Sequence, residues 1–205
     1  GKGTHAALDR AQQFARQYRY VLPCDVRQFF PSIDHALLRR ILARKIDDAD
    51  ALWLVDQILA SGAGVLSEEY EMVYFAGDDL FSANRQRGLP IGNLTSQFWA
   101  NCYLNPFDHF VKRELACPAY LRYVDDFLLF SDDKQTLSSW REAILHRLAG
   151  LRLTLHEASA QARRTQDGAS FLGFILFPEY RRLKPARCIA FQRRYRQMRR
   201  SLAEG

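Results

Sequence analysis

One stretch of sequence decides the fold: Tyr120-Leu121-Arg122-Tyr123-Val124-Asp125-Asp126-Phe127-Leu128-Leu129-Phe130. Two mostly apolar runs flank the pair Asp125-Asp126, which predicts an antiparallel hairpin with the two aspartates at its turn. Two-residue hairpin turns favour Asn-Gly or Asp-Gly, because their central positions need positive φ. Two aspartates form such a turn poorly, and their charges repel each other. A bound divalent cation would remove this conflict; for the pair taken alone, a solvent-exposed acidic turn is the alternative interpretation.

A third aspartate ends another apolar strand earlier in the chain. The run Tyr20-Val21-Leu22-Pro23-Cys24-Asp25-Val26 predicts a short strand, and Pro23 suits an edge or a bulge better than a central position. Transfer of a nucleotide to a 3′-hydroxyl uses two metal ions ~3.5–4 Å apart. Two strands must then deliver acidic side chains to one point. Asp25 opposite the tip of the Asp125-Asp126 hairpin meets this requirement.

The composition is that of an ordinary globular protein. Of 205 residues, 48% are apolar and 25% are charged, which excludes a disordered tail, a collagen-like fibre and a disulfide miniprotein. No apolar run approaches the roughly 20 residues that a membrane span requires, and the first residues do not resemble a signal peptide. The four cysteines lack CxxC spacing and are interpreted as buried thiols of a reducing compartment. We therefore expect a cytoplasmic protein without membrane contact.

Positive charge is concentrated near the C-terminus. The net charge is +6, and the segment 181–200 holds nine Lys or Arg and no acid, which leaves the rest of the chain slightly acidic. A basic block beside an acidic site predicts a polyanionic partner. The alternative is a solvated amphipathic helix end, which charge runs often form.

The remaining pattern predicts an α+β fold, because helices and strands interleave without a regular βαβ rhythm. A long helix is expected to begin at Asn93, with a kink at Pro106, and Gly150 is expected to end another. The predicted helices cover 4–18, about 35–42, 49–60, 93–114, 134–149 and the basic segment, and the predicted strands outside the hairpin cover 20–26, 72–75, 151–156 and 171–177.

Four motifs, in matching order and spacing from Gly1 to Phe177, resemble those of reverse transcriptases. Tyr123-Val124-Asp125-Asp126 resembles the Y-x-D-D box, and the segment Asp25–His35 resembles the motif that carries the first catalytic aspartate in bacterial members. Gly88–Gln97 is similar to the template- and nucleotide-binding loop, and Phe171-Leu172-Gly173-Phe174 to the primer-grip hairpin.

This resemblance implies a right-hand polymerase palm with partial fingers, in which an antiparallel sheet packs on helices and a basic helix follows. Residues 1–178 would form the partial fingers and palm, and residues 179–205 the start of the thumb. Further finger residues are expected before Gly1 and a fuller thumb after Gly205. We therefore expect this stretch alone to bind metal and nucleic acid but to polymerise weakly or not at all.

The binding loop narrows the resemblance to one subfamily. Group II intron and retron enzymes carry glutamine where this chain has Ile91, and here Gln97 follows the serine. This variant resembles reverse transcriptases of diversity-generating retroelements. The resemblance implies an RNA-directed DNA polymerase that makes cDNA with errors opposite adenine for mutagenic retrohoming, assisted by a basic helical accessory protein. The alternatives are a retron-, CRISPR- or defence-associated reverse transcriptase, or a catalytically silent nucleic-acid-binding palm.

The resemblance also implies roles for single residues. Asp25, Asp125 and Asp126 would be catalytic and, with the backbone carbonyl of Val26, would hold two Mg²⁺ ions, for which Mn²⁺ can substitute; the amide of Val26 would face phosphate. The expected partners are template RNA, the primer or cDNA, and deoxynucleoside triphosphates (dNTPs). Nucleotide binding is assigned to Phe30, Pro90, Ile91, Gly92 and Gln97, and nucleic-acid binding to Tyr123, Leu172, Gly173, Arg187, Arg193 and Arg194.

Several of these roles have structural alternatives. Phe30 would block a ribose 2′-hydroxyl, or it would be a core residue, a position for which Phe29 is better suited. Ile91 cannot hydrogen-bond a sugar, so it either loosens the check on pairing or packs into the core. The lysine that the family often places after the strand at 151–156 is missing, and the nearest cations are Arg163 and Arg164. Arg122 is expected on the solvated side of its hairpin.

Overall fold

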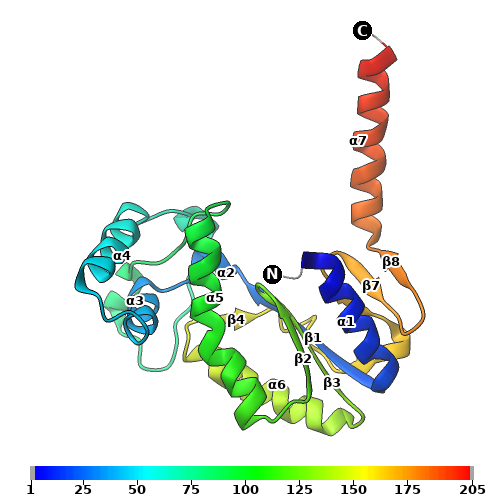
Figure 1. Ribbon diagram of the computed structural model, residues 1–205, viewed down its shortest axis with the longest axis horizontal. Helices are drawn as coiled ribbons and strands as arrows, with labels where there is room; N and C mark the ends of the chain where they lie inside the picture. Colours follow the sequence, from blue (N-terminus) through cyan, green and yellow to red (C-terminus); the bar gives the residue numbers. More distant parts are fainter. Residues whose placement is uncertain (1–2, 204–205) are drawn as a thin grey trace.

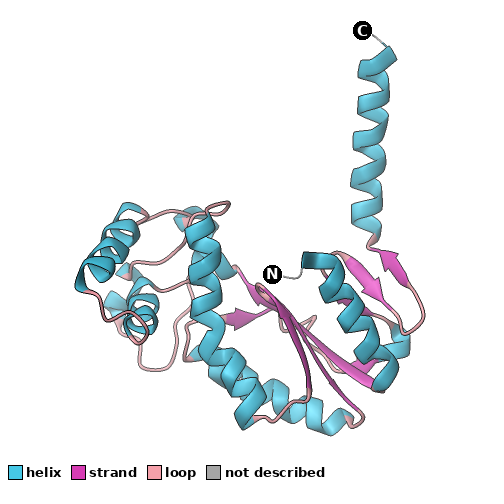
Figure 2. Cartoon of the chain, viewed as in Figure 1, coloured by secondary structure: helices cyan, strands magenta, loops and turns pink. Residues whose placement is uncertain are grey.

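A computed structural model describes residues 3–203, except the side chains of 186–188 and 200–203. The α+β class is confirmed: helices surround one five-stranded and one three-stranded antiparallel sheet (Figures 1 and 2). The helices are α1 (Gly3–Gln17), α2 (Phe29–Ser32), α3 (His35–Ala43), α4 (Ala49–Ser61), α5 (Leu94–His109), α6 (Lys134–Ala149) and α7 (Pro185–Ala203). The strands are β1 (Tyr20–Arg27), β2 (Ala119–Tyr123), β3 (Asp126–Ser131), β4 (Thr154–Leu155), β5 (Arg163–Arg164), β6 (Ala169–Phe171), β7 (Phe174–Leu176) and β8 (Arg181–Leu183).

The larger sheet has the order β2-β3-β1-β4, and β5 also pairs with β1. Strand β1 is antiparallel to β3 from Tyr20 opposite Ser131 to Asp25 opposite Asp126. On its other side, β5 pairs with residues 20–21 and β4 with residues 26–27. Pro23 therefore lies in an interior strand, but at a position between these two short pairings. This explains how proline is tolerated away from the edge that the sequence suggested.

The two faces of this sheet pack against different elements. Side chains alternate along a strand, so Leu22 and Cys24 join a core with α3, α5 and α6, whereas Val21 joins a second core with α1 and the β6–β7 hairpin. Asp25 has the parity of Val21, and Asp126 has the parity of Leu128, which also lies in the second core. Both carboxylates therefore belong to the face that α1 and β6–β7 cover.

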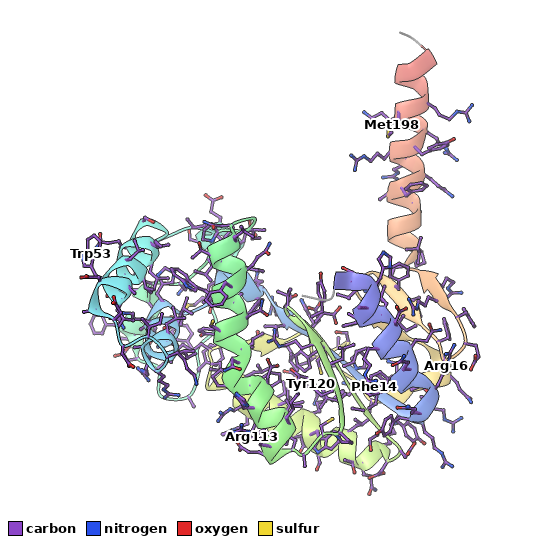
Figure 3. The ribbon with its side chains drawn as sticks, in the orientation of Figure 1. Phe14, Arg16, Trp53, Arg113, Tyr120 and Met198 are labelled. Atoms are coloured by element: carbon purple, nitrogen blue, oxygen red, sulfur yellow. The ribbon has the colours of Figure 1, made fainter. Side chains whose placement is uncertain are left out.

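Most predicted helices and strands are present, with two clear corrections. Residues 72–75 are not a strand: this segment has no strand partner in the described part of the chain. The predicted strand at 171–177 is instead part of a hairpin, because the Leu172-Gly173 turn separates β6 from β7. Helix α4 buries Val55 and Leu59, whereas Trp53 is 62% exposed. Figure 3 shows Trp53 on the outer side of α4.

The last strands and the basic segment form an appendage. The sheet β6-β7-β8 is followed directly by α7, which projects away from the rest of the molecule (Figure 1). Figure 3 shows Met198 near the far end of this helix, where it is 56% exposed. The predicted basic helix is therefore present.

Two expectations from composition can be compared with the described residues. Within residues 3–203, no helix combines the length and apolarity that crossing a membrane would need. Cys24 and Cys117 are buried, Cys102 is half-buried, and all three are free thiols. Burial raises the pKa of each, Cys117 to about 11, so these thiols stay protonated at neutral pH. The side chain of Cys188 lies outside the described residues.

Candidate active site

The acidic hairpin is present, but its turn lies one residue earlier than predicted. Tyr123 pairs with Asp126, so Val124 and Asp125 form the turn and Asp126 is the first residue of β3. Val124 has φ +58°. Asp125 is not among the described residues with positive φ, and this combination is typical of a type II′ turn, whose first central position usually holds glycine. A β-branched residue with this backbone is strained, as residues at functional sites often are.

Arg122 holds this strained turn in place. Its guanidinium donates two hydrogen bonds to the Asp108 carboxylate, at 2.7 and 2.6 Å, and one to the Val124 carbonyl at 2.8 Å. The Arg122 side chain is only 11% exposed. The prediction of a solvated Arg122 was wrong, because Asp108 on α5 provides a half-buried partner that the local sequence does not reveal.

Asp25, Asp125 and Asp126 line one cavity of about 560 Å³. Asp25 and Asp126 are directly opposite each other on β1 and β3, and Asp125 precedes Asp126 in the turn. Like charges at opposite positions of a sheet destabilise it, so this arrangement is unusual for a purely structural pair. The other lining residues come from α1, α2, the hairpin tip, the turn between β6 and β7, and the residue after β8: Thr4, Phe30, Tyr123, Val124, Leu172, Gly173 and Lys184.

The pKa of each carboxyl is raised. Burial is the largest cause in every case, although Asp25 keeps the most solvent contact of the three. The charge of Asp25 also raises the pKa of Asp125 and of Asp126, and burial together with both neighbouring carboxylates brings the pKa of Asp126 to about 7. The cavity therefore carries negative charge that is incompletely hydrated and would be stabilised by a cation.

The fit of these donors to a divalent cation can be assessed from their arrangement. Across the described residues, no three His, Cys, Asp or Glu side chains are grouped as a ready-made metal cage. Mg²⁺ commonly binds through one or two carboxylates plus substrate phosphates, which suits three acids around an open cavity. The Val26 side chain is buried in the core, and its amide donates to the Asp125 carbonyl at 3.2 Å. The expectation that this amide faces phosphate is therefore wrong.

The Leu172-Gly173 turn closes one side of the cavity. Both residues have positive φ, +48° and +85°, as in a type I′ hairpin turn between β6 and β7. The Leu172 amide donates to Asp126 Oδ2 at 3.0 Å. The predicted primer-grip segment thus holds one of the three carboxylates through its backbone.

Phe30 and Tyr123 line the same cavity, as their assignments require. Phe29 is 2% exposed in the core, whereas Phe30 is half-buried and contacts the cavity. This arrangement favours Phe29 as the core residue of the pair. The Tyr123 hydroxyl accepts a hydrogen bond from Thr4 Oγ1 at 3.1 Å, which joins the start of α1 to the hairpin.

The binding-loop residues lie outside this cavity. Ile91 is 65% exposed, so it is not a core residue, and Gly92 has φ +92° beside it. Pro90 lines a separate small cavity beside Gly88. Gln97 lines a neighbouring groove of about 970 Å³, which it shares with Tyr123 and Val124. Of the loop residues, Gln97 alone therefore lies beside the hairpin tip in the described structure.

The basic residues fall into two groups, one on α7 and one beside β1. Arg193 and Arg194 are exposed on α7, and the side chain of Arg187 lies outside the described residues. Arg164 pairs with Tyr20 and Arg163 with Val21, at the end of β1 away from Asp25, and neither lines the cavity.

Among the described residues that line the cavity, Lys184 is the one Lys or Arg, and the sequence pattern gave it no role in the site. The available signal was its position immediately before Pro185, at the expected start of the basic helix.

Comparison with known proteins identifies the family to which this chain belongs. Residues 1–176 match the family model described as "Reverse transcriptase (RNA-dependent DNA polymerase)". The chain belongs to the reverse transcriptase family. One curated relative is Protein YkfC of Escherichia coli (strain K12), which is 25% identical over 205 residues; the match covers 84% of this chain and 50% of the relative. The chain therefore spans about half the length of this relative.

Solved structures support the same fold. The apo telomerase of Candida tropicalis superposes with a TM-score of 0.54 at 13% identity, over 89% of this chain and 36% of the telomerase. The same telomerase truncated from its C-terminal domain gives a TM-score of 0.54 at 12% identity, over 89% of this chain and 40% of that chain. At this identity the likeness concerns the fold alone. The diversity-generating subtype was predicted from motif details that these comparisons do not address.

Proposed function

We propose that the chain is the catalytic palm of an RNA-directed DNA polymerase that extends a primer along template RNA. The observation that carries the proposal is the pairing of Asp25 with Asp126 across β1 and β3, with Asp125 in the adjoining turn of the same cavity. Three carboxylates with raised pKa values at one point match the requirement of nucleotidyl transfer for closely spaced cations.

Asp25, Asp125 and Asp126, with the carbonyl of Val26, would hold two Mg²⁺ ions, and Mn²⁺ can substitute. When bound, the ions acidify the attacking 3′-hydroxyl and neutralise the triphosphate. The protein itself fixes the geometry: Arg122 and Asp108 hold the turn that carries Asp125, and the Leu172 amide orients the carboxylate of Asp126.

Phe30 would select the sugar of the incoming nucleotide. Its ring lies at the cavity while Phe29 anchors the segment in the core. An aromatic side chain beneath the sugar excludes a 2′-hydroxyl by its volume, and this hydroxyl is the group that distinguishes RNA from DNA. The Leu172-Gly173 turn would support the primer end, and Arg187, Arg193 and Arg194 of α7 would contact the phosphates of the duplex.

We further propose the diversity-generating subtype, with frequent errors opposite adenine and a basic helical accessory protein as partner. Ile91 supports this assignment, because an exposed apolar side chain stands where related enzymes carry a glutamine that can hydrogen-bond the nascent pair. A retron-, CRISPR- or defence-associated enzyme would carry the same aspartates. Copying of an adenine-containing template distinguishes these assignments, since only the mutagenic subtype should misincorporate mainly opposite adenine.

One observation favours a second candidate, a nucleic-acid-binding palm without activity. Arg193 and Arg194 are exposed on α7, where they would contact phosphate whether or not the acidic cavity binds metal. Extension of a DNA primer on defined RNA, with Mg²⁺ and the four dNTPs, separates the two candidates. The assay is made on residues 1–205 and on a longer protein that adds fuller fingers and thumb. In the longer protein the wild type should extend the primer and the Asp125→Ala, Asp126→Ala double variant should not. Equal extension by both longer proteins would remove the proposed catalytic site.

A further inference from the structure

Lys184 is a cation placed among carboxylates at the cavity, and no role has so far been assigned to it. Among the described residues that line the cavity, it carries the one Lys or Arg charge, against three aspartates. Its charge lowers the pKa of Asp25 and of Asp126, which places the ammonium on the side of these two carboxylates. Lys184 is therefore part of the electrostatics of the site rather than of the exposed basic face of α7.

The backbone holds Lys184 at this point. Lys184 follows β8, and its amide donates to the Gly173 carbonyl at 3.0 Å. Pro185 follows as the first residue of α7, where its fixed φ is well suited to a helix start. The Leu172-Gly173 turn is consequently bonded on one side to Asp126 and on the other to Lys184.

A nucleic-acid end that enters this cavity meets an electrostatic problem. Its last phosphodiester is negative and approaches three carboxylates, which repel it across a poorly hydrated space. A cation beside the Leu172-Gly173 turn offsets that repulsion at the place where the strand would lie. A lysine ammonium is a compact charge on a flexible stem and binds phosphate as a point charge.

We propose that Lys184 binds the terminal phosphodiester of the strand whose 3′ end lies against the Leu172-Gly173 turn. The inference rests on the proposed function in one respect, namely that this strand is the primer. Without nucleic acid, the same ammonium offsets part of the negative charge of Asp25 and Asp126. Binding of the strand then moves the ammonium toward the phosphate and leaves both carboxylates available to cations.

The test is the binding of a labelled DNA primer annealed to RNA, measured by fluorescence anisotropy in EDTA at salt concentrations from about 50 to about 200 mM. Each phosphate that the protein neutralises contributes about one unit to the slope of log Kd against log salt. Lys184→Gln should weaken binding about tenfold and reduce the slope of log Kd against log salt by about 1. Lys184→Arg should restore both. Lys112→Gln is the matched control: Lys112 is exposed in the segment 110–114 that follows α5 and does not line the cavity, so its loss should change neither quantity.

A primer with a neutral methylphosphonate at its last phosphodiester identifies the contact. Wild-type protein should bind this primer about as weakly as Lys184→Gln binds the normal one, roughly the tenfold loss of one phosphate contact. The variant should lose nothing further on the modified primer. Equal losses from the substitution on both primers would overturn the proposal, as would an unchanged salt slope. The wild-type measurement with the two primers remains decisive if Lys184→Gln does not fold.

Steady-state primer extension separates the role of Lys184 from the polymerase function itself. Lys184→Gln should raise the KM for primer–template and leave the KM for dNTP unchanged; a rise in the dNTP KM alone would place Lys184 against the triphosphate and refute the assignment. Absence of extension that depends on Asp125 and Asp126 would refute the polymerase function, whereas the binding results would still decide the role of Lys184.

Discussion

The charge cluster should make the metal-free protein less stable as pH rises, and Asp126→Asn should relieve this cost. Asparagine has nearly the same shape as aspartate and can still accept the hydrogen bond from the Leu172 amide. The substitution therefore removes the charge of Asp126 while preserving its contact. Asp25, Asp125 and Lys184 are the charged groups that face it.

The sign follows from the protons bound in each state. The pKa of Asp126 is about 7 in the folded protein, against 3.8 ordinarily, so between these pH values the folded state binds a proton that the unfolded state has released. Stability consequently falls as pH rises through this window, and the full cost is present above pH 7. The upper bound at pH 8 is ~4 kcal/mol. Partial exposure and coupling to the other acids reduce our expectation to about 2 kcal/mol.

The assay is thermal unfolding followed by circular dichroism in EDTA. For a chain of this size, about 2 kcal/mol corresponds to a Tm increase of about 4–8 °C for Asp126→Asn at pH 8. Near pH 4.5 the difference should be much smaller, because the pH is then less than one unit above the ordinary pKa of 3.8 at which the cost begins. The exposed Asp47→Asn serves as the control and should not change Tm at either pH. A Tm difference that is independent of pH, or a lower Tm for Asp126→Asn at pH 8, would refute the reasoning.

Three further predictions follow from single positions. Phe30→Ala should admit ribonucleotides, which extension with rNTPs measures, and unchanged sugar selection would exclude a gating role. Gly88→Ala should destabilise the protein by about 2–4 kcal/mol in chemical denaturation, because its Cβ would lie 2.4 Å from the Val65 carbonyl oxygen and φ is +95°; wild-type stability would contradict the close packing of this loop. Ile91→Gln should reduce errors opposite adenine in sequenced products, and an unchanged error spectrum would separate Ile91 from fidelity.

The elements around the acids could be predicted because their signals are local. Apolar alternation gave the hairpin and β1, and Asp133 and Gly150 mark the two ends of α6 where the structure has them. The convergence of Asp25 with Asp126 was inferred from the chemistry of nucleotidyl transfer, and the strand register agrees with it.

The remaining features depend on contacts between distant segments. The turn starts at Val124 rather than Asp125, because Arg122 and Asp108 stabilise a backbone that valine alone would avoid. Local propensity cannot reveal such a partner on another helix.

The absent strand at 72–75 has a similar cause. The nearby Asp78 carboxylate accepts hydrogen bonds from the Phe75 amide and from Arg152, and its side chain is only 1% exposed. Side-chain contacts thus hold this segment to the body in place of a strand ladder. Such contacts leave no periodic pattern in the sequence.

The position of α7 has a mechanical consequence. Its nineteen residues correspond to a rod of about 28 Å, so a tilt of ten degrees at Pro185 displaces the far end by roughly 5 Å. This tilt would pivot next to Lys184. The Lys184 amide donates to the Gly173 carbonyl, and the Leu172 amide donates to the carboxylate of Asp126, so two hydrogen bonds connect Lys184 with that carboxylate. A movement of the far end of α7 would therefore reach Asp126, opposite Asp25, as a much smaller displacement.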